Sequence, residues 1–256
     1  MSQLFNIMIV GKVENPMIYY TGDIHGQKYE IVRFCKRFNL TGEDTVVILG
    51  DVAANYYGNG RDNDLKDAFK SLKPTILCIH GNHEMRPTSI STYKEKEWNG
   101  GTVWYEEAYP KLLFAKDGEI YTIEGIRHIA IGGAYSVDKY YRLARGYAWW
   151  ADEQPSEEIM AYVEQQLKEN EIDIVLSHTC PYKYEPTEMF LPGVDQSTVD
   201  TSTEEWLGKI EEAIDYKAWF CGHWHINNRI DKIHILFHGF ESSEQFMENK
   251  EDGRTD

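Results

Sequence analysis

Short runs of apolar residues recur along the chain, and each is closed by glycine or polar residues. Their length and their richness in Ile, Val, Leu and aromatic side chains are typical of strands buried on both faces. The runs cover residues 17–21, 45–49, 75–79, 172–177 and 219–221. We expect these five runs to form the centre of a β-sheet structure.

Segments with helical periodicity lie between the apolar runs, at residues 28–39, 64–71, 155–170 and 203–216. In the first of them, Ile31, Phe34, Cys35 and Phe38 are spaced so that they share one helix face. Pro155 stands near the start of the third, where a helix tolerates its fixed φ. Strands that alternate with helices favour βαβ units and a largely parallel sheet.

Residues 102–131 have a different pattern, with shorter alternating runs. The pair Asp117-Gly118 is a common hairpin turn. We therefore expect an antiparallel meander here, which makes the sheet mixed or adds a second sheet.

The composition narrows the class of protein. With 256 residues, 42% hydrophobic, the chain is long enough for one large α/β domain. The formal net charge of −16 disfavours general nucleic-acid binding, because an acidic protein repels phosphate backbones. No apolar run approaches the ~18–20 residues that span a bilayer.

Two further features indicate a cytoplasmic protein. The first residues lack a basic segment and a cleavage site, so we expect no signal peptide. The four cysteines show no paired spacing and stand mostly in apolar runs, as buried thiols of a reducing compartment do.

Each of the five apolar runs is followed by side chains that can bind a metal ion. In chain order these are Asp23 and His25, then Asp51, then Asn82 beside His83, then His178, and finally His223 and His225. Because the carboxyl ends of parallel strands share one edge of a sheet, we expect these groups to converge. One of them alone could be a turn residue, a helix cap or a buried histidine. Their recurrence after five successive strands instead indicates a metal centre.

The ordered motifs GDIHG, GDVAAN, GNHE, SHTCP and GHWH resemble those of the calcineurin-like metallophosphoesterase family, between residues 22 and 225. The resemblance implies an α/β fold in which two mixed β-sheets pack as a sandwich flanked by helices. The layers would be αββα, with the metal site at the C-terminal ends of the strands. We expect this domain at residues 1–240 and a polar, mobile tail at residues 241–256.

The resemblance also implies two metal ions. One would be held by Asp23, His25, Asp51 and His225, and the other by Asp51, Asn82, His178 and His223, with Asp51 as the bridge. Nitrogen and oxygen ligands without thiolate suit divalent or trivalent manganese, iron or zinc. The implied reaction is in-line attack of a metal-bridging hydroxide on phosphorus. His83 would be the general acid for the leaving group.

The chain departs from the protein-phosphatase branch of the family at two positions of the second motif. Ala54 stands where that branch has the Asp that orients the catalytic histidine, and Asn55 replaces its phosphate-binding Arg. His80 stands before GNHE, where that branch has an arginine. A phosphoprotein substrate is therefore not favoured, and another group must bind the phosphate.

Candidates for substrate binding are Asn55, as a neutral hydrogen-bond donor, and the arginines Arg86 and Arg142. Arg61 and Arg145 are further arginines near these motifs. Arg142 is favoured because it follows the GGAYS stretch and precedes an aromatic cluster. The aromatic residues of that cluster could stack on a base or an aryl group, or could pack the loop.

We predict a binuclear metal-dependent phosphoesterase that hydrolyses a phosphomonoester or a phosphodiester. Its partner would be a small phosphorylated substrate, for which a nucleotide is one candidate, and the oligomeric state stays open. One alternative is a dinucleoside-polyphosphate or RNA-end phosphate hydrolase of the same family. Another is a non-catalytic metal-binding scaffold with this fold, against which the intact ligand set and His83 argue.

Overall fold

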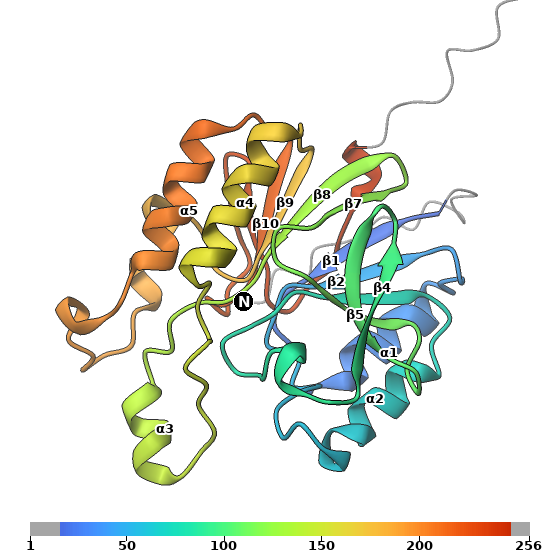
Figure 1. The fold of residues 1–256 in the computed structure, drawn as a ribbon, viewed down its shortest axis with the longest axis horizontal. Helices are drawn as coiled ribbons and strands as arrows, with labels where there is room; N and C mark the ends of the chain where they lie inside the picture. The colour runs from blue at the N-terminus through green and yellow to red at the C-terminus, as the bar shows by residue number, and fades with distance from the viewer. Residues whose placement is uncertain (1–15, 247–256) are drawn as a thin grey trace, which may run out of the picture.

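The computed structural model describes residues 16–246, so the expectations for the first residues of the chain and for residues 247–256 lie outside it. Within this range the chain forms two mixed sheets, with helices on their outer faces (Figure 1). The layers follow the order helix, sheet, sheet, helix, which confirms the predicted αββα sandwich.

The first sheet has seven strands in the order β13-β1-β2-β3-β6-β5-β4. Strands β1, β2, β3 and β6 run parallel, and β4, β5 and β13 are antiparallel to their neighbours. The bounds are β1 Ile18–Thr21, β2 Thr45–Ile48, β3 Thr75–Cys78, β4 Tyr93–Trp98, β5 Gly101–Glu106, β6 Leu112–Ala115 and β13 Glu241–Ser242.

The second sheet has six strands in the order β11-β12-β10-β9-β8-β7. Its four central strands are parallel, and the edge strands β7 and β11 are antiparallel. The bounds are β7 Ile120–Ile123, β8 Ile126–Ile131, β9 Ile174–Ser177, β10 Ala218–Cys221, β11 Asn228–Ile230 and β12 Ile233–Ile235.

Five α-helices accompany the sheets in the described range: α1 Lys28–Arg37, α2 Asn63–Lys70, α3 Lys139–Arg145, α4 Glu157–Glu169 and α5 Ser202–Ala213. Four of them were expected from periodicity. Helix α4 begins after Ser156, whose hydroxyl accepts a hydrogen bond from the backbone N–H of Ile159, so Pro155 precedes the helix. Helix α3 was not expected, because two turns are too short to show a clear period. In Figure 1 it stands clear of the sheets, at the end of a long excursion between β8 and α4.

Burial on both faces explains why the central strands are continuously apolar. In β2, Val46 and Ile48 pack with residues of α1 and α2, whereas Val47 and the following Leu49 face the second sheet. On the far side of the second sheet, Val163 of α4 and Leu207 of α5 close a third apolar cluster. Burying each such side chain contributes about 1.5–3 kcal/mol.

The middle of the chain confirms the antiparallel prediction but not its turn. Asp117-Gly118 connects β6 to β7, which belong to different sheets, so it is not a hairpin. The hairpin turns are Asn99-Gly100 and Glu124-Gly125, and both residues of each pair have positive φ. The prediction was wrong because local turn chemistry does not specify which strands pair.

The predicted domain boundary at residue 240 is also too early. Strand β13 pairs antiparallel with β1, and the backbone N–H of Ile18 donates to the hydroxyl of Ser243 over 3.2 Å. Residues 241–246 are therefore part of the domain rather than of a mobile tail, because they cover the edge of β1. No helix between residues 16 and 246 is long and apolar enough to cross a bilayer.

Candidate metal centre

Metal-binding side chains gather where the carboxyl ends of both sheets meet. Asp23, Asp51 and Asn82 follow β1, β2 and β3 of the first sheet, while His178 follows β9 and His223 follows β10 of the second. Three sets of side chains place their ligand atoms within 4.8 Å of one another: Asp23, His25 and His225; His25, Asp51 and His83; and Asp23, Asp51 and His178. Asp23, Asp51, Asn82 and His178 are buried, whereas His25 and His225 are accessible from solvent.

Asp51 lies at the middle of this cluster. One carboxylate oxygen, Oδ2, is 3.8 Å from Nε2 of His25, and the other, Oδ1, is 3.7 Å from Nε2 of His178. The two oxygens therefore each lie near a histidine that follows a strand of a different sheet. Such a position suits a carboxylate that bridges two ions.

The hydrogen bonds of His178 indicate that a cation belongs beside it. Its Nδ1 lies 2.7 Å from the carbonyl oxygen of Leu49, which can only accept, so in a singly protonated ring the proton is on Nδ1. The lone pair of Nε2 then faces Oδ1 of Asn82 over 2.8 Å. Two acceptors that face each other are stabilised by a metal ion, and a backbone carbonyl is the usual partner of the distal N–H in a metal-bound histidine.

The ligands around Asp23 lead to the same conclusion. Its Oδ2 is buried and has no hydrogen-bond partner among the described residues. Nε2 of His225 lies 3.2 Å from this oxygen, and the Nε2 atoms of His25 and His225 are 2.8 Å apart. This donor set of one carboxylate and two imidazoles fits a divalent ion of the first transition series.

Glycines of the motifs let the two aspartates approach neighbouring backbone. A side chain at Gly81 would collide with Oδ1 of Asp51, and one at Gly222 would collide with Oδ1 of Asp23. Without those side chains, Oδ1 of Asp51 accepts the backbone N–H of His83, and Oδ1 of Asp23 accepts that of His223, each over 2.8 Å. Each glycine therefore serves a ligand that is distant in sequence.

The backbone is strained at the same place. His25, Asp51, His223 and His225 all have φ between 42° and 66°. This region costs a non-glycine residue about 1–3 kcal/mol, and it persists where the surrounding structure holds it. Four such residues in one cluster indicate that the fold keeps the ligands in position at the expense of stability.

Electrostatics separate the roles of the charged and neutral ligands. Burial by itself would raise the pKa of Asp23, but the imidazole of His225 beside its carboxylate and the nearby His178 and His25 lower it to about 2. Burial lowers the pKa of His223 to about 3, and His178 adds to this effect. Asp23 is therefore anionic and His223 neutral near pH 7, as metal ligands must be.

His83 lies over the centre, with part of its ring exposed. Its ring is 5.5 Å from that of His25, edge to face. Its Nε2 lies 3.8 Å from Oδ1 of Asp138, the residue before α3. Burial lowers the pKa of His83, Asp51 and Asp138 oppose this, and Arg142 adds to it. Asp138 thus brings a carboxylate close to His83, and no feature of the sequence signalled it.

The three candidate substrate-binding residues have different surroundings. Arg86 is committed elsewhere, because its guanidinium contacts Asp117 over 2.6 Å and the carbonyl oxygen of Asp152 over 2.8 Å. Asn55 is fully buried and accepts a hydrogen bond from the hydroxyl of Tyr93. The amide nitrogen of Asn55, the predicted donor to substrate, has no hydrogen-bond partner among the described residues, so this role stays a prediction. The role of Arg86 also stays a prediction, although its guanidinium is already paired.

Arg142 differs from both. It is 3% exposed, and neither terminal nitrogen of its guanidinium has a hydrogen-bond partner within residues 16–246. The ring of Trp150 lies 5.5 Å from its Cζ. A buried guanidinium without an anion is costly, so Arg142 stays the favoured candidate for binding the phosphate.

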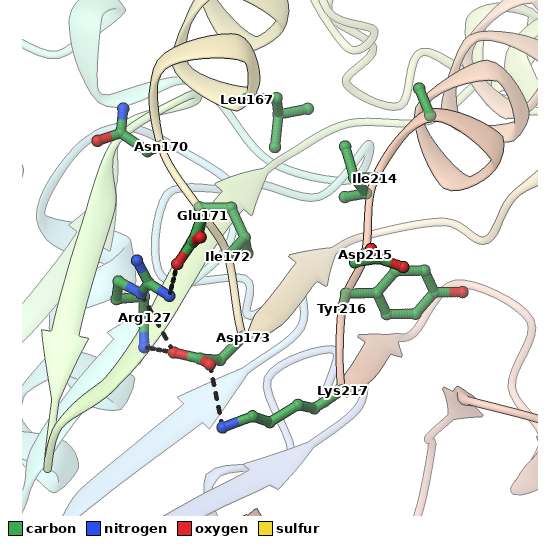
Figure 2. Close-up of a pocket in the computed structure, with 11 residues that line it drawn as sticks. Arg127, Leu167, Asn170, Glu171, Ile172, Asp173, Ile214, Asp215, Tyr216 and Lys217 are labelled. Atoms are coloured by element: carbon green, nitrogen blue, oxygen red, sulfur yellow. Dashed lines mark hydrogen bonds and ion pairs between the residues drawn. The ribbon is translucent and has the colours of Figure 1, made fainter.

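A cavity of the described structure lies away from this centre. Its volume is about 490 Å³, and it is bordered by the residues that precede β9 and β10 (Figure 2). Asp173 there accepts from Lys217 over 3.1 Å and from Arg127 over 3.4 Å, so its charges are already paired. The metal-binding residues follow the opposite ends of the same two strands.

Comparison with known proteins agrees with the motifs. A family model described as calcineurin-like phosphoesterase matches residues 16–227. The chain belongs to this family. No curated protein matches it.

Two solved structures are similar in fold to this calcineurin-like phosphoesterase. The phosphopantetheinyl hydrolase of Mycobacterium tuberculosis is 14% identical, with a TM-score of 0.51 and 89% of each chain covered. The protein TT1561 of Thermus thermophilus is 9% identical, with a TM-score of 0.47, 89% of this chain and 97% of that chain covered. At these identities the likeness concerns the fold alone.

Membership of the calcineurin-like phosphoesterase family accounts for the cluster at the strand ends. Asp and His side chains there could hold a metal ion, and the family is generally hydrolytic. All four cysteines are buried and unpaired by disulfides, and none joins the metal-binding sets found between residues 16 and 246.

Proposed function

We propose that the chain is a binuclear metal-dependent phosphoesterase acting on a small phosphomonoester or phosphodiester. The observation that carries this proposal is Asp51, whose two oxygens lie near different histidines, His25 and His178. One ion would be held by Asp23, His25, Asp51 and His225, and the other by Asp51, Asn82, His178 and His223. Bound there, two such ions supply the activated water and neutralise charge on the phosphoryl group.

The protein's own residues supply binding and proton transfer. Arg142 pairs with a phosphoryl oxygen through its two free terminal nitrogens. His83 donates a proton to the leaving oxygen, and Asp138 stabilises the charged ring before the transfer. The charge of Arg142 lowers the pKa of His83, so the two side chains are near each other and a phosphate bound by Arg142 would lie near His83.

The substrate belongs to the soluble phosphoesters of the cytoplasm, and a nucleotide is one candidate. The ring of Trp150 lies near both the guanidinium of Arg142 and the ring of Tyr56. A leaving group with a flat ring could stack on these aromatic side chains, so we favour such a substrate. The mycobacterial structural neighbour is named for phosphopantetheinyl hydrolysis, which makes phosphopantetheinyl esters a second class to assay.

The test uses p-nitrophenyl phosphate and its bis ester, with manganese and with chelator. Turnover that requires metal supports the enzyme, and its absence for both esters and for a wider panel favours the scaffold alternative. Asp51→Asn should abolish activity and loosen both ions, because one bridging carboxylate serves both. Elemental analysis measures the ion content, and two retained ions with normal turnover would exclude the bridging role.

A further inference from the structure

The amide of Asn82 is oriented by contacts at both of its ends. Its oxygen faces Nε2 of His178 over 2.8 Å. Its nitrogen, Nδ2, donates to the hydroxyl oxygen of Ser136 over 2.8 Å. Asn82 is buried, so water cannot replace either partner. A reversed amide would present two N–H donors to the metal centre, and an N–H group cannot bind a cation.

The hydrogen bonds of Glu153 fix the direction of the hydrogen bond between Asn82 and Ser136. Because Ser136 receives the amide proton, its own hydroxyl proton is free to go to Oε2 of Glu153, which lies 2.5 Å away. The indole N–H of Trp149 donates to the same oxygen over 2.8 Å, and the backbone N–H of Ser136 donates to Oε1 over 3.1 Å. Every group that faces Glu153 here is a donor, so the buried carboxylate can only accept.

We propose that Ser136 and Glu153 are positioning residues that orient Asn82 for metal binding. The inference rests on the proposed function, since it concerns one of the two ions of that site. The carboxylate holds the hydroxyl as an acceptor toward Asn82, and the hydroxyl holds the amide with its oxygen toward His178. Loss of an outer partner of a metal ligand typically lowers metal affinity by about 10–100-fold.

The hydrogen bond between Ser136 and Glu153 also joins the two ends of the segment that carries α3. Ser136 and Glu153 stand at the two ends of the excursion that carries α3, Asp138 and Arg142. The ends meet closely, because a side chain at Gly133 would collide with the carbonyl oxygen of Glu153. The segment that supplies the phosphate-binding cation is thus fastened to a metal ligand. Ion binding by Asn82 therefore stabilises the base of that segment.

Glu153→Gln is the most informative variant. An amide of the same shape places its NH₂ group against at least one donor in either orientation, so at least one of the two contacts with Ser136 is lost without leaving a cavity. Ser136→Ala removes the same contact from the other side, and serves if the first variant does not fold. Glu164→Gln is the matched control, because Glu164 also accepts from a tryptophan, Trp206, over 3.1 Å.

Ion binding is measured on the full chain, dialysed against chelator-buffered manganese and assayed for metal content. We expect one ion to bind as in the parent and the other about 10–100-fold more weakly in both variants. At saturating manganese kcat should recover, and Glu164→Gln should match the parent throughout. Thermal unfolding in chelator reports on folding independently of the metal.

Folded variants that bind both ions with parental affinity overturn the inference. So does an equal weakening of both ions, which a general loss of structure would produce. A parent that binds two ions but hydrolyses no ester contradicts the proposed function alone, since the comparison of affinities remains valid. A parent that binds no ion refutes both.

Discussion

Replacing Arg142 by methionine should stabilise the free protein while it damages the site. The side chain is 3% exposed, and the terminal nitrogens of its guanidinium have no partner within the described residues. Methionine keeps much of the length and packing of the arginine stem but needs no anion. The same change at Arg86 should do the reverse, because that guanidinium is paired with buried Asp117 over 2.6 Å.

The magnitudes follow from the two environments. An unpaired buried ion costs several kcal/mol after relaxation, of which the contact with Trp150 returns about 0.5–2 kcal/mol. Arg142→Met should therefore raise the free energy of unfolding by about 1–3 kcal/mol, or roughly 2–10 °C in Tm for a chain of this size. Arg86→Met leaves the buried carboxylate of Asp117 without its cation, although the backbone N–H of Gly132 still donates to it, and should cost about 3–5 kcal/mol.

The functional effect of Arg142→Met has the opposite sign. Each hydrogen bond to a charged group contributes about 1.5–3 kcal/mol, so losing both terminal nitrogens should lower kcat/KM for a phosphomonoester by about 10²-fold or more. Thermal unfolding without ligand and steady-state kinetics with metal measure the two effects. Added inorganic phosphate should raise the Tm of the parent more than that of the variant.

Two results would refute this reasoning. If Arg142→Met lowers Tm as Arg86→Met does, the guanidinium has a structural partner and is not held for an anion. If Arg142→Met is more stable but keeps parental kcat/KM, the unpaired guanidinium does destabilise the fold, but the substrate does not bind to it.

Four more predictions concern proton transfer and the core. His83→Ala should keep both ions and much of its p-nitrophenyl ester activity but lose about 10²-fold on an alkyl phosphate, whose leaving group needs a proton. Asp138→Asn should shift the same aryl-to-alkyl ratio of kcat/KM less strongly; an unchanged ratio in both variants excludes the acid role. Tyr20→Phe should cost about 1–3 kcal/mol in urea unfolding, because Nε2 of buried His128 loses the hydroxyl that lies 2.7 Å away; equal stability would mean that the hydrogen bond contributes nothing. Burial lowers the pKa of His128 from 6.5 to about 4, so between these pH values the unfolded chain binds a proton at His128 that the folded chain does not. The free energy of unfolding should therefore fall by about 3 kcal/mol as the pH is lowered from 6.5 to 4. The double variant Tyr20→Phe, His128→Leu should lack this dependence of unfolding free energy on pH when it and the parent are unfolded in the presence of chelator.

The sequence by itself determined the sandwich core and the members of the metal cluster. A strand that is buried on both faces must be apolar throughout, so β2 can be predicted from its amino-acid sequence alone. Ligands that follow parallel strands must share an edge, so Asp23 and Asp51 could be expected together before any distance was known. Glycine before each of them is equally local information, since the chain must turn there.

Only the tertiary structure decided what supports that cluster. Asp138, Ser136 and Glu153 come from the excursion between β8 and α4, which has no periodicity to fix its path. Arg142, a candidate from the sequence, comes from the same excursion, and only the structure shows that it is buried without a partner among the described residues. The same holds for Arg86, whose charge is neutralised by Asp117 from a segment 31 residues away. A local pattern specifies which residues can bury, turn or bind. Which charge meets which partner depends on contacts between distant segments, and those exist only once the two sheets have packed.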